Sequence, residues 1–255
     1  MNTQRSLTKD EIATFNRDGF LVARGLYDAA AVRALSDWSD EILAWPETPG
    51  EHMVYYEDSL SEPETRVIAR IENFCPYHKD FNKIVGEGQM IDMVSQLLGE
   101  PAVLFKEKMN FKMPGGAGFT PHQDAQAGWN VYADFYITAL VCIDAATVEN
   151  GCLEMVRGFH DKGLVSEEWA PLDDNSMSDM VFEPCPTEPG DAIFFDSYAP
   201  HQSAPNLTAN PRRVLYVTYN KASQGDHRIA YYRDKRASYP PDIERTSDKE
   251  YVFRV

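Results

Sequence analysis

The chain reads TPHQD at residues 120–124, between two segments of opposite character. Residues 113–118, MPGGAG, are typical of a loop, whereas residues 132–143 are rich in the aromatic and β-branched residues that favour strands. In an extended chain, residues i and i+2 point to the same side, so His122 and Asp124 can meet one ion while Gln123 faces away. The stretch predicts a strand-rich fold with a metal-binding pair at a loop–strand boundary.

A second histidine follows a comparable boundary farther along the chain. Residues 188–191, EPGD, predict a turn, and residues 192–195, AIFF, predict a short buried strand that leads to His201. Another turn is predicted at residues 206–211, and Arg212 opens the strand-like segment after it. An isolated His-x-Asp is a frequent chance match in a chain with six histidines and 40 acidic residues. Together with His201, however, it can supply two imidazoles and one carboxylate to one face of Fe(II), which leaves the other face open.

From about residue 101 to residue 221 the chain resembles the phytanoyl-CoA dioxygenase family of non-haem Fe(II), 2-oxoglutarate-dependent oxygenases. The matching segments are PHQD at 121–124, VENGCL at 148–153, PGD at 189–191, HQS at 201–203, and Arg212. Residues 7–11 and 18–22 also resemble the usual first helix and first strand of these proteins. One departure is RGFH at residues 157–160, where the family usually has a Pro-Gly-Ser-His turn. We interpret His160 as structural.

The resemblance implies a role for each matched residue. It implies that iron is ligated by His122, Asp124 and His201, and that the distal carboxylate of the co-substrate 2-oxoglutarate is bound by Arg212 and Ser203. A guanidinium suits this role because its planar fork can hold a carboxylate in two parallel hydrogen bonds. Arg213 is adjacent, but neighbours on a strand face opposite sides, and the family spacing favours Arg212.

Three lysines before the metal loop form a further pattern. Lys106, Lys108 and Lys112 alternate along a predicted strand and are expected to share one face. A buried ammonium needs an anionic partner, which could be 2-oxoglutarate or an anionic substrate. We group Lys108 with Arg212 and Ser203 as residues that bind the co-substrate.

The element pattern predicts a mainly β fold with flanking helices. Residues 8–18 predict a helix with a capping box formed by Thr8 and Glu11, residues 29–44 an amphipathic helix, and residues 83–98 a third helix stopped by Gly99. Short strands dominate from residue 103 onward. The expected fold is a double-stranded β-helix, a jelly-roll or cupin-like barrel with N-terminal helices, and residues 1–255 are expected to be a single oxygenase domain.

Two smaller patterns each leave alternatives open. Arg66 and Arg70 lie four residues apart, as on one helix face or one strand face. Residues 164–187 interrupt the strands as a surface loop or a lid, which we expect to border the entrance to the site.

Composition narrows the class of partner and the compartment. The net charge of −16 disfavours nucleic acid or an anionic membrane as a partner, because both would be repelled. The sequence has no apolar run of transmembrane length and no signal peptide, so the expected compartment is the cytoplasm. The four cysteines show no metal-binding spacing and are expected to be buried thiols.

The expected function is hydroxylation of an unactivated C–H bond with release of succinate and CO₂. Asp124 favours hydroxylation, because related halogenating enzymes have a small residue there to admit a halide. We expect a small anionic or zwitterionic substrate, since the whole-chain resemblance, including residues 225–228 and 240–243, extends to bacterial oxygenases that hydroxylate 2-aminoethylphosphonate. The alternatives are an acyl-CoA or another small molecule as substrate, a non-catalytic cupin-like binding protein, and a zinc hydrolase.

Overall fold

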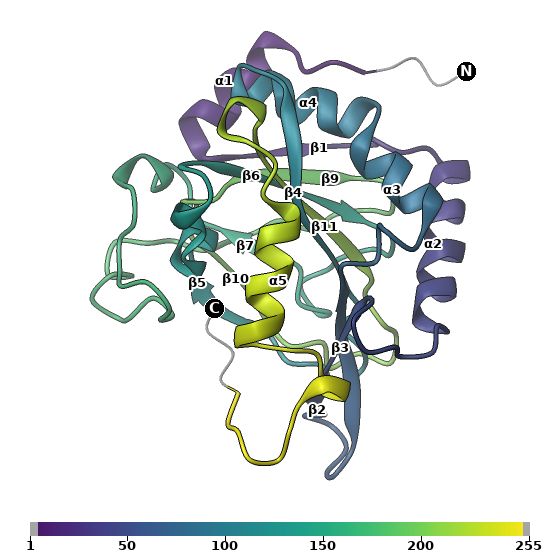
Figure 1. The fold of residues 1–255 in the computed structure, drawn as a ribbon. Coiled ribbons are helices and arrows are strands. Elements are labelled where there is room, and N and C mark those ends of the chain that lie inside the picture. The colour runs from purple at the N-terminus through teal and green to yellow at the C-terminus, as the bar shows by residue number, and fades with distance from the viewer. Residues whose placement is uncertain (1–4, 252–255) are drawn as a thin grey trace.

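The computed structural model describes residues 5–251 and has two antiparallel sheets packed face to face (Figure 1). In spatial order, the larger sheet contains β1 (Phe20–Ala23), β9 (Ala192–Asp196), β6 (Tyr136–Cys142), β11 (Val214–Lys221), β4 (Ala102–Asn110), β3 (Arg66–Glu72) and β2 (Met53–Asp58). The smaller sheet contains β5 (Phe119–His122), β10 (His201–Ser203), β7 (Leu153–Met155) and β8 (Glu183–Pro184). This architecture confirms the predicted double-stranded β-helix.

Alternation along the strands of the larger sheet separates two apolar layers. On β6, Ala139 and Val141 face the helices, whereas Leu140 and Cys142 face the smaller sheet. The helices on the outer side are α1 (Lys9–Asp18), α2 (Ala29–Leu43), α3 (Lys79–Gly86) and α4 (Gln89–Leu98) (Figure 1). The inner layer places the site between the two sheets.

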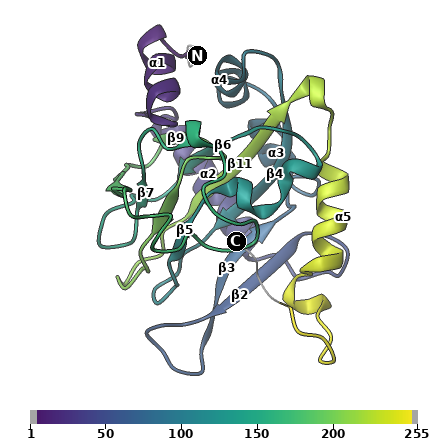
Figure 2. The same cartoon turned by 90° about the vertical axis from the view of Figure 1, so that its left-hand side faces the viewer.

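Short 3₁₀ helices and one further α-helix complete the fold. The 3₁₀ helices are η1 (Asp124–Ala127), η2 (Trp129–Val131), η3 (His160–Lys162), η4 (Ala222–Gln224) and η5 (Asp242–Glu244). The last α-helix, α5 (Arg228–Ser238), runs alongside β4 (Figure 2).

The starts of the helices show which sequence signals set the helix boundaries. At α1 the Thr8 hydroxyl accepts from the Glu11 amide and the Glu11 carboxylate accepts from the Thr8 amide, so the predicted capping box is confirmed. The single helix predicted at residues 83–98 is wrong, because the chain forms α3 and α4 with a break at Gly88. Gly88, which precedes α4, has a φ of 85°, a non-helical conformation that costs glycine little.

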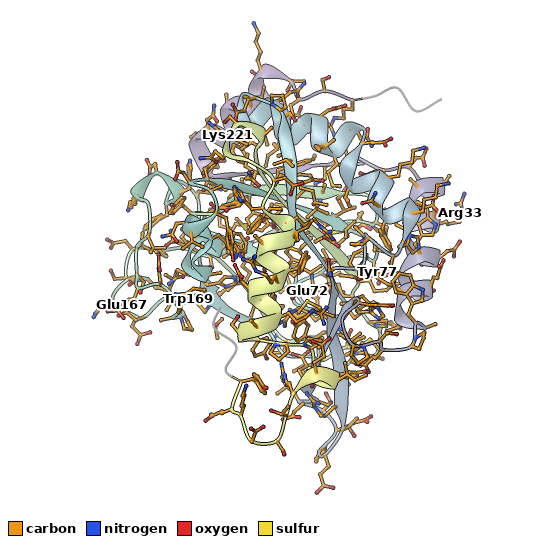
Figure 3. All side chains as sticks on the ribbon, viewed as in Figure 1. Arg33, Glu72, Tyr77, Glu167, Trp169 and Lys221 are labelled. Atoms are coloured by element: carbon orange, nitrogen blue, oxygen red, sulfur yellow. The ribbon has the colours of Figure 1, made fainter. Side chains whose placement is uncertain are left out.

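Two buried carboxylates hold α5 against the larger sheet. Glu107 accepts from the Arg228 guanidinium at 2.7 Å, and Glu72 accepts from the Lys235 ammonium at 2.6 Å. Figure 3 shows Glu72 beside this helix. Burial opposes ionisation of Glu72, but Lys235 and Arg70 outweigh burial and lower the pKa of its carboxyl group. The end of the barrel near β3 and β4 is therefore closed by ion pairs.

The four cysteines, Cys75, Cys142, Cys152 and Cys185, are buried free thiols, as predicted. Among the described residues, no helix has the length and apolarity needed to cross a membrane.

Candidate metal centre and anion sites

The two histidines of the sequence pattern meet across the smaller sheet. His201 on β10 pairs in register with His122 on β5, and their ring centroids are 4.2 Å apart. Asp124 begins η1 two residues after His122, and Gln123 between them is extended, with a φ of −109° and a ψ of 136°, so His122 and Asp124 point to the same side as predicted. The candidate ligand atoms of His122, Asp124 and His201 all lie within 4.8 Å of one another. Within residues 5–251 no other three His, Cys, Asp or Glu residues form such a group.

Hydrogen bonds orient each member of this group. The Nδ1 atom of His122 lies 2.7 Å from the Thr120 carbonyl, and Nδ1 of His201 lies 3.0 Å from the Ala199 carbonyl. Each Nδ1 therefore donates to a carbonyl oxygen and leaves the Nε2 lone pair for a metal. The Asp124 carboxylate accepts from the Thr138 hydroxyl at 3.1 Å, so β6 helps to fix its direction.

The electrostatics of the group suit a divalent cation. Burial lowers the pKa of both imidazoles, and His201 lowers that of His122 further. Burial opposes ionisation of Asp124, but His201, Lys106 and His122 outweigh burial and lower its pKa. At neutral pH the group is two neutral imidazoles and one carboxylate, the protonation state that a metal requires. This donor set fits Fe(II) with an open face.

Arg212 is buried close to Lys112, whose carbonyl accepts from the Arg212 amide at 3.2 Å. The residue is only 2% exposed, and its Nε atom has no hydrogen-bond partner. Within the described part of the chain its guanidinium makes no ion pair with a carboxylate. A buried permanent cation of this kind is costly unless a ligand supplies the anion. The carboxylate of 2-oxoglutarate fits that requirement.

A hydrogen bond from Lys112 orients the Ser203 hydroxyl so that it can donate to the same anion. The Lys112 ammonium donates to the Ser203 hydroxyl at 2.9 Å and to the Gly151 carbonyl at 3.2 Å, and it also contacts the Ala204 carbonyl. Because Ser203 accepts from Lys112, its own proton is available for a ligand. Burial, with a contribution from Arg212, lowers the pKa of Lys112 to about 7.

The prediction that one strand carries all three lysines is wrong for Lys112, because β4 ends at Asn110 and Lys112 has a φ of 33°. Its ammonium nevertheless faces the smaller sheet at Ser203, as that of Lys108 does at Phe119. Period-two alternation applies only while the chain stays extended. Asn110 was not singled out from the sequence, yet it is 2% exposed and both polar atoms of its side-chain amide lack partners. Nothing in a lone asparagine within a strand signals this environment.

Lys106 and Lys108 remain together on β4 as a second cationic pair. The Lys108 ammonium lies 4.7 Å from the Tyr216 ring centroid, and the Lys106 ammonium lies 4.0 Å from the Trp129 ring centroid. Among residues 5–251 neither ammonium has an ion pair or a hydrogen bond. Burial, together with Lys106, lowers the pKa of Lys108 to about 7. This lysine pair is therefore a second candidate anion site.

The remaining cations are satisfied by the protein. Arg70 and Arg66 lie on one strand, β3, where Arg70 donates to Glu72 at 2.7 Å and the exposed Arg66 pairs with Asp242 at 2.7 Å. Arg213 pairs with Asp144 at 2.9 Å and also with Asp40 at 2.8 Å, outside the metal group.

Two histidines outside the metal group have structural contacts elsewhere in the fold. His160 Nε2 lies 3.3 Å from the Asn16 carbonyl, beside the end of α1. His78 caps the start of α3 through its Nδ1 atom.

Comparison with known proteins gives matches along most of the chain. The family model "Phytanoyl-CoA dioxygenase (PhyH)" matches residues 15–214. A 2-aminoethylphosphonate dioxygenase from Uncultured bacterium HF130_AEPn_1 is 40% identical over 96% of this chain and 93% of the relative. A methylphosphonate hydroxylase from Gimesia maris is 40% identical over 94% of this chain and 90% of the relative.

The fold is also similar to solved structures. The crystal structure of EctD from S. alaskensis with 2-oxoglutarate and 5-hydroxyectoine superposes with a TM-score of 0.73 at 22% identity. The superposition covers 86% of this chain and 77% of that chain. At this identity the similarity concerns the fold alone.

Proposed function

Because this chain belongs to the phytanoyl-CoA dioxygenase family and is a non-haem Fe(II)- and 2-oxoglutarate-dependent dioxygenase, we propose that it hydroxylates a C–H bond of a small phosphonate such as 2-aminoethylphosphonate. The observation that carries the proposal is the lysine pair on the strand that leads to the metal loop: Lys106 is buried, Lys108 is half-buried, and within residues 5–251 neither ammonium makes an ion pair. The two phosphonate-directed relatives, each 40% identical, support the same substrate class.

The metal and co-substrate roles are part of the proposal. We assign iron ligation to His122, Asp124 and His201, and binding of the distal carboxylate of 2-oxoglutarate to Arg212 and Ser203. When bound, iron and 2-oxoglutarate supply the activation of O₂ that hydroxylates a C–H bond, with release of succinate and CO₂. The protein's own contribution is to orient the ligands through Nδ1 and Thr138 hydrogen bonds and to place cations where the organic anions bind.

The charge of the lysine pair favours a phosphonate over an acyl-CoA. A phosphonate carries up to two negative charges next to the carbon to be oxidised, so it can bring both charges to Lys106 and Lys108. The acyl end of an acyl-CoA is neutral, and its phosphates lie far along the molecule. That substrate would leave the two ammonium groups without an ion-pair partner, an arrangement that burial disfavours.

We also propose that residues 1–255 form a single oxygenase domain. Support comes from the larger apolar layer, which joins Leu7 near the start of the chain to Tyr219 on β11.

Succinate formation across a substrate panel tests the proposal. The protein is incubated with Fe(II), ascorbate and 2-oxoglutarate, and 2-aminoethylphosphonate, methylphosphonate or an acyl-CoA is added. We expect a phosphonate to raise succinate above the no-substrate control and the acyl-CoA to leave it at background. Stimulation by the acyl-CoA alone would overturn the substrate assignment. Failure to bind Fe(II) at micromolar concentration would instead favour a non-catalytic binding protein.

The pKa of Lys108 predicts how phosphonate affinity changes with pH. Lys108 is surrounded by Lys106, Asp124, Arg70 and Glu72, and the balance leaves its pKa at about 7 in the absence of ligand. Above this pH the ammonium loses its proton, whereas the anionic substrate requires the charged form. The KM for the phosphonate should therefore rise by up to about tenfold per pH unit above pH 7.

Lys108→Arg is the matched variant, because a guanidinium keeps its charge throughout this pH range. We expect its KM to stay flat where the wild-type KM rises. Both proteins are assayed from about pH 6 to about pH 9 with saturating 2-oxoglutarate. Titration of Lys112 then does not change the measured KM through weaker binding of the co-substrate. Parallel profiles for the two proteins would show that Lys108 does not bind the substrate anion.

A further inference from the structure

Residues 163–172, here called the strap, cover the start of the 164–187 insertion and contact the metal-binding turn. From residue 163 to residue 171 the strap has no buried residue, and Trp169 is 46% exposed. Figure 3 shows Glu167 and Trp169 at the outer edge of the molecule. Leu172, at the end of the strap, is buried, but apolar burial contributes little to holding residues 163–171, so their position has to come from another source.

Two fully buried glutamines supply that source. Gln126 donates through Nε2 to the Glu167 carbonyl at 2.9 Å and to the Ala170 carbonyl at 2.6 Å. Gln123 donates to the Gly163 carbonyl at 2.8 Å and accepts from the Val165 amide at 2.9 Å. Both glutamines are 0% exposed, and one flanks Asp124 while the other lies two residues after it.

The same glutamines also close the turn that carries Asp124. The Gln123 amide donates to Oε1 of Gln126 at 2.8 Å, and the Gln126 amide donates to the Gln123 carbonyl at 2.9 Å. The Gln126 carbonyl in turn accepts from the Trp169 amide at 2.8 Å. One side chain, Gln126, is thus hydrogen-bonded to the turn on one side and to the strap on the other.

The other contacts between strap and turn are a backbone hydrogen bond from the Leu172 amide to the Pro121 carbonyl at 2.8 Å and the Trp169 ring. Trp169 has a φ of 66°, unusual for a residue with a side chain, and its ring lies where a Cβ at Gly128 would approach it to 2.2 Å. A cavity of about 220 Å³ lies next to the turn, lined among others by Ala125, Leu164 and Tyr198. The hydrogen bonds of the two glutamines are consequently the main connection between the strap and the turn.

We propose that Gln126, assisted by Gln123, is a positioning residue that uses the strap to hold Asp124 in its metal-binding orientation. The inference rests on the proposed role of Asp124 as an iron ligand. Among the described residues, the Asp124 carboxylate receives one side-chain hydrogen bond, from Thr138, so the geometry of its turn decides where the carboxylate points. The strap's hydrogen bonds to Gln126 and Gln123 restrict the movement of the turn.

Gln126→Glu separates the two connections of this side chain. A carboxylate can still accept from the Gln123 amide, but it cannot donate to the Glu167 and Ala170 carbonyls. We expect Fe(II) to bind roughly 10- to 100-fold more weakly, the range typical for loss of a group that orients a metal ligand. We also expect faster tryptic cleavage of the Lys162–Gly163 bond, where the strap begins. Both are measured on one preparation, by anaerobic equilibrium dialysis with Fe(II) alone and by limited trypsin digestion.

Asn130→Ala is the matched control. Asn130 donates to the Glu168 carboxylate at 2.7 Å from an exposed position, so this variant removes a strap contact without touching the turn. Its Fe(II) affinity should equal that of the wild type. Gln126→Met is a second variant that avoids a buried charge and should also weaken Fe(II) binding, with a melting curve to confirm that it folds.

The outcomes separate this inference from the proposed function. A strap that is cleaved faster in Gln126→Glu while Fe(II) affinity stays at the wild-type value would overturn the inference and leave the metal assignment intact. A wild-type protein that does not bind Fe(II) would overturn the metal assignment and the inference with it. Weaker Fe(II) binding in both Gln126 variants but not in Asn130→Ala supports the inference.

Discussion

Asp124→Ala should abolish succinate formation and weaken Fe(II) binding. The carboxylate is the only anion among the three candidate ligands, and the two remaining imidazoles are neutral. Loss of one partner of a buried, charge-assisted contact costs roughly 2–5 kcal/mol, so we expect Fe(II) affinity to fall by roughly 10² to 10³-fold. Turnover is measured as phosphonate-dependent succinate, and Fe(II) binding by anaerobic dialysis.

Asp196→Asn is the control for this experiment. Asp196 is a buried carboxylate at the end of β9, and burial raises its pKa to about 7. It accepts from the Tyr198 amide at 2.7 Å, which the side-chain oxygen of an asparagine can also do. We expect this variant to keep wild-type Fe(II) affinity. Wild-type turnover in Asp124→Ala would refute the ligand assignment.

Arg212→Met should raise the KM for 2-oxoglutarate by roughly 10² to 10³-fold, because the guanidinium is the permanent charge buried for the co-substrate carboxylate. The same change should leave the thermal stability of the ligand-free protein unchanged or raise it. In the ligand-free state Arg212 is a buried cation without a carboxylate, and replacing such a group by an apolar side chain of similar volume removes a desolvation cost. Function and stability are thus expected to change in opposite directions.

Arg213→Met is the matched variant at the neighbouring position. Arg213 pairs with Asp144 and Asp40 in the folded protein, so its loss should lower the melting temperature by a few degrees and leave the KM for 2-oxoglutarate unchanged. Initial rates against 2-oxoglutarate concentration and melting curves without ligand provide both readouts. A normal KM in Arg212→Met would remove Arg212 from the co-substrate site.

The parts of the site that were predictable from sequence are those encoded locally. His122, Asp124, His201 and Arg212 come in short motifs next to turns and strands, and the capping box of α1 spans only four residues. The local structure of such short motifs depends on residues close in sequence, so the folded chain keeps it.

The parts that were missed depend on the exact end of an element or on distant partners. Lys112 continues the alternation of Lys106 and Lys108 in sequence, but the strand stops at Asn110. Gln126 becomes important only because residues more than 40 positions later return to it. A periodic pattern contains no information about either event.

The attachment of α5 has a consequence for how the protein is made. A ribosome releases the sheet strands before α5, so the nascent sheet has Glu107 and Glu72 ready while Arg228 and Lys235 are still unmade. Glu72 already has Arg70 on its own strand, but Glu107 gains its ion-pair partner only with Arg228, and a carboxylate cannot enter an apolar interior alone, so this end of the barrel has to remain hydrated until α5 emerges. Synthesis therefore imposes an order on folding, in which the metal ligands are available first and the neighbourhood of the lysine pair is closed last.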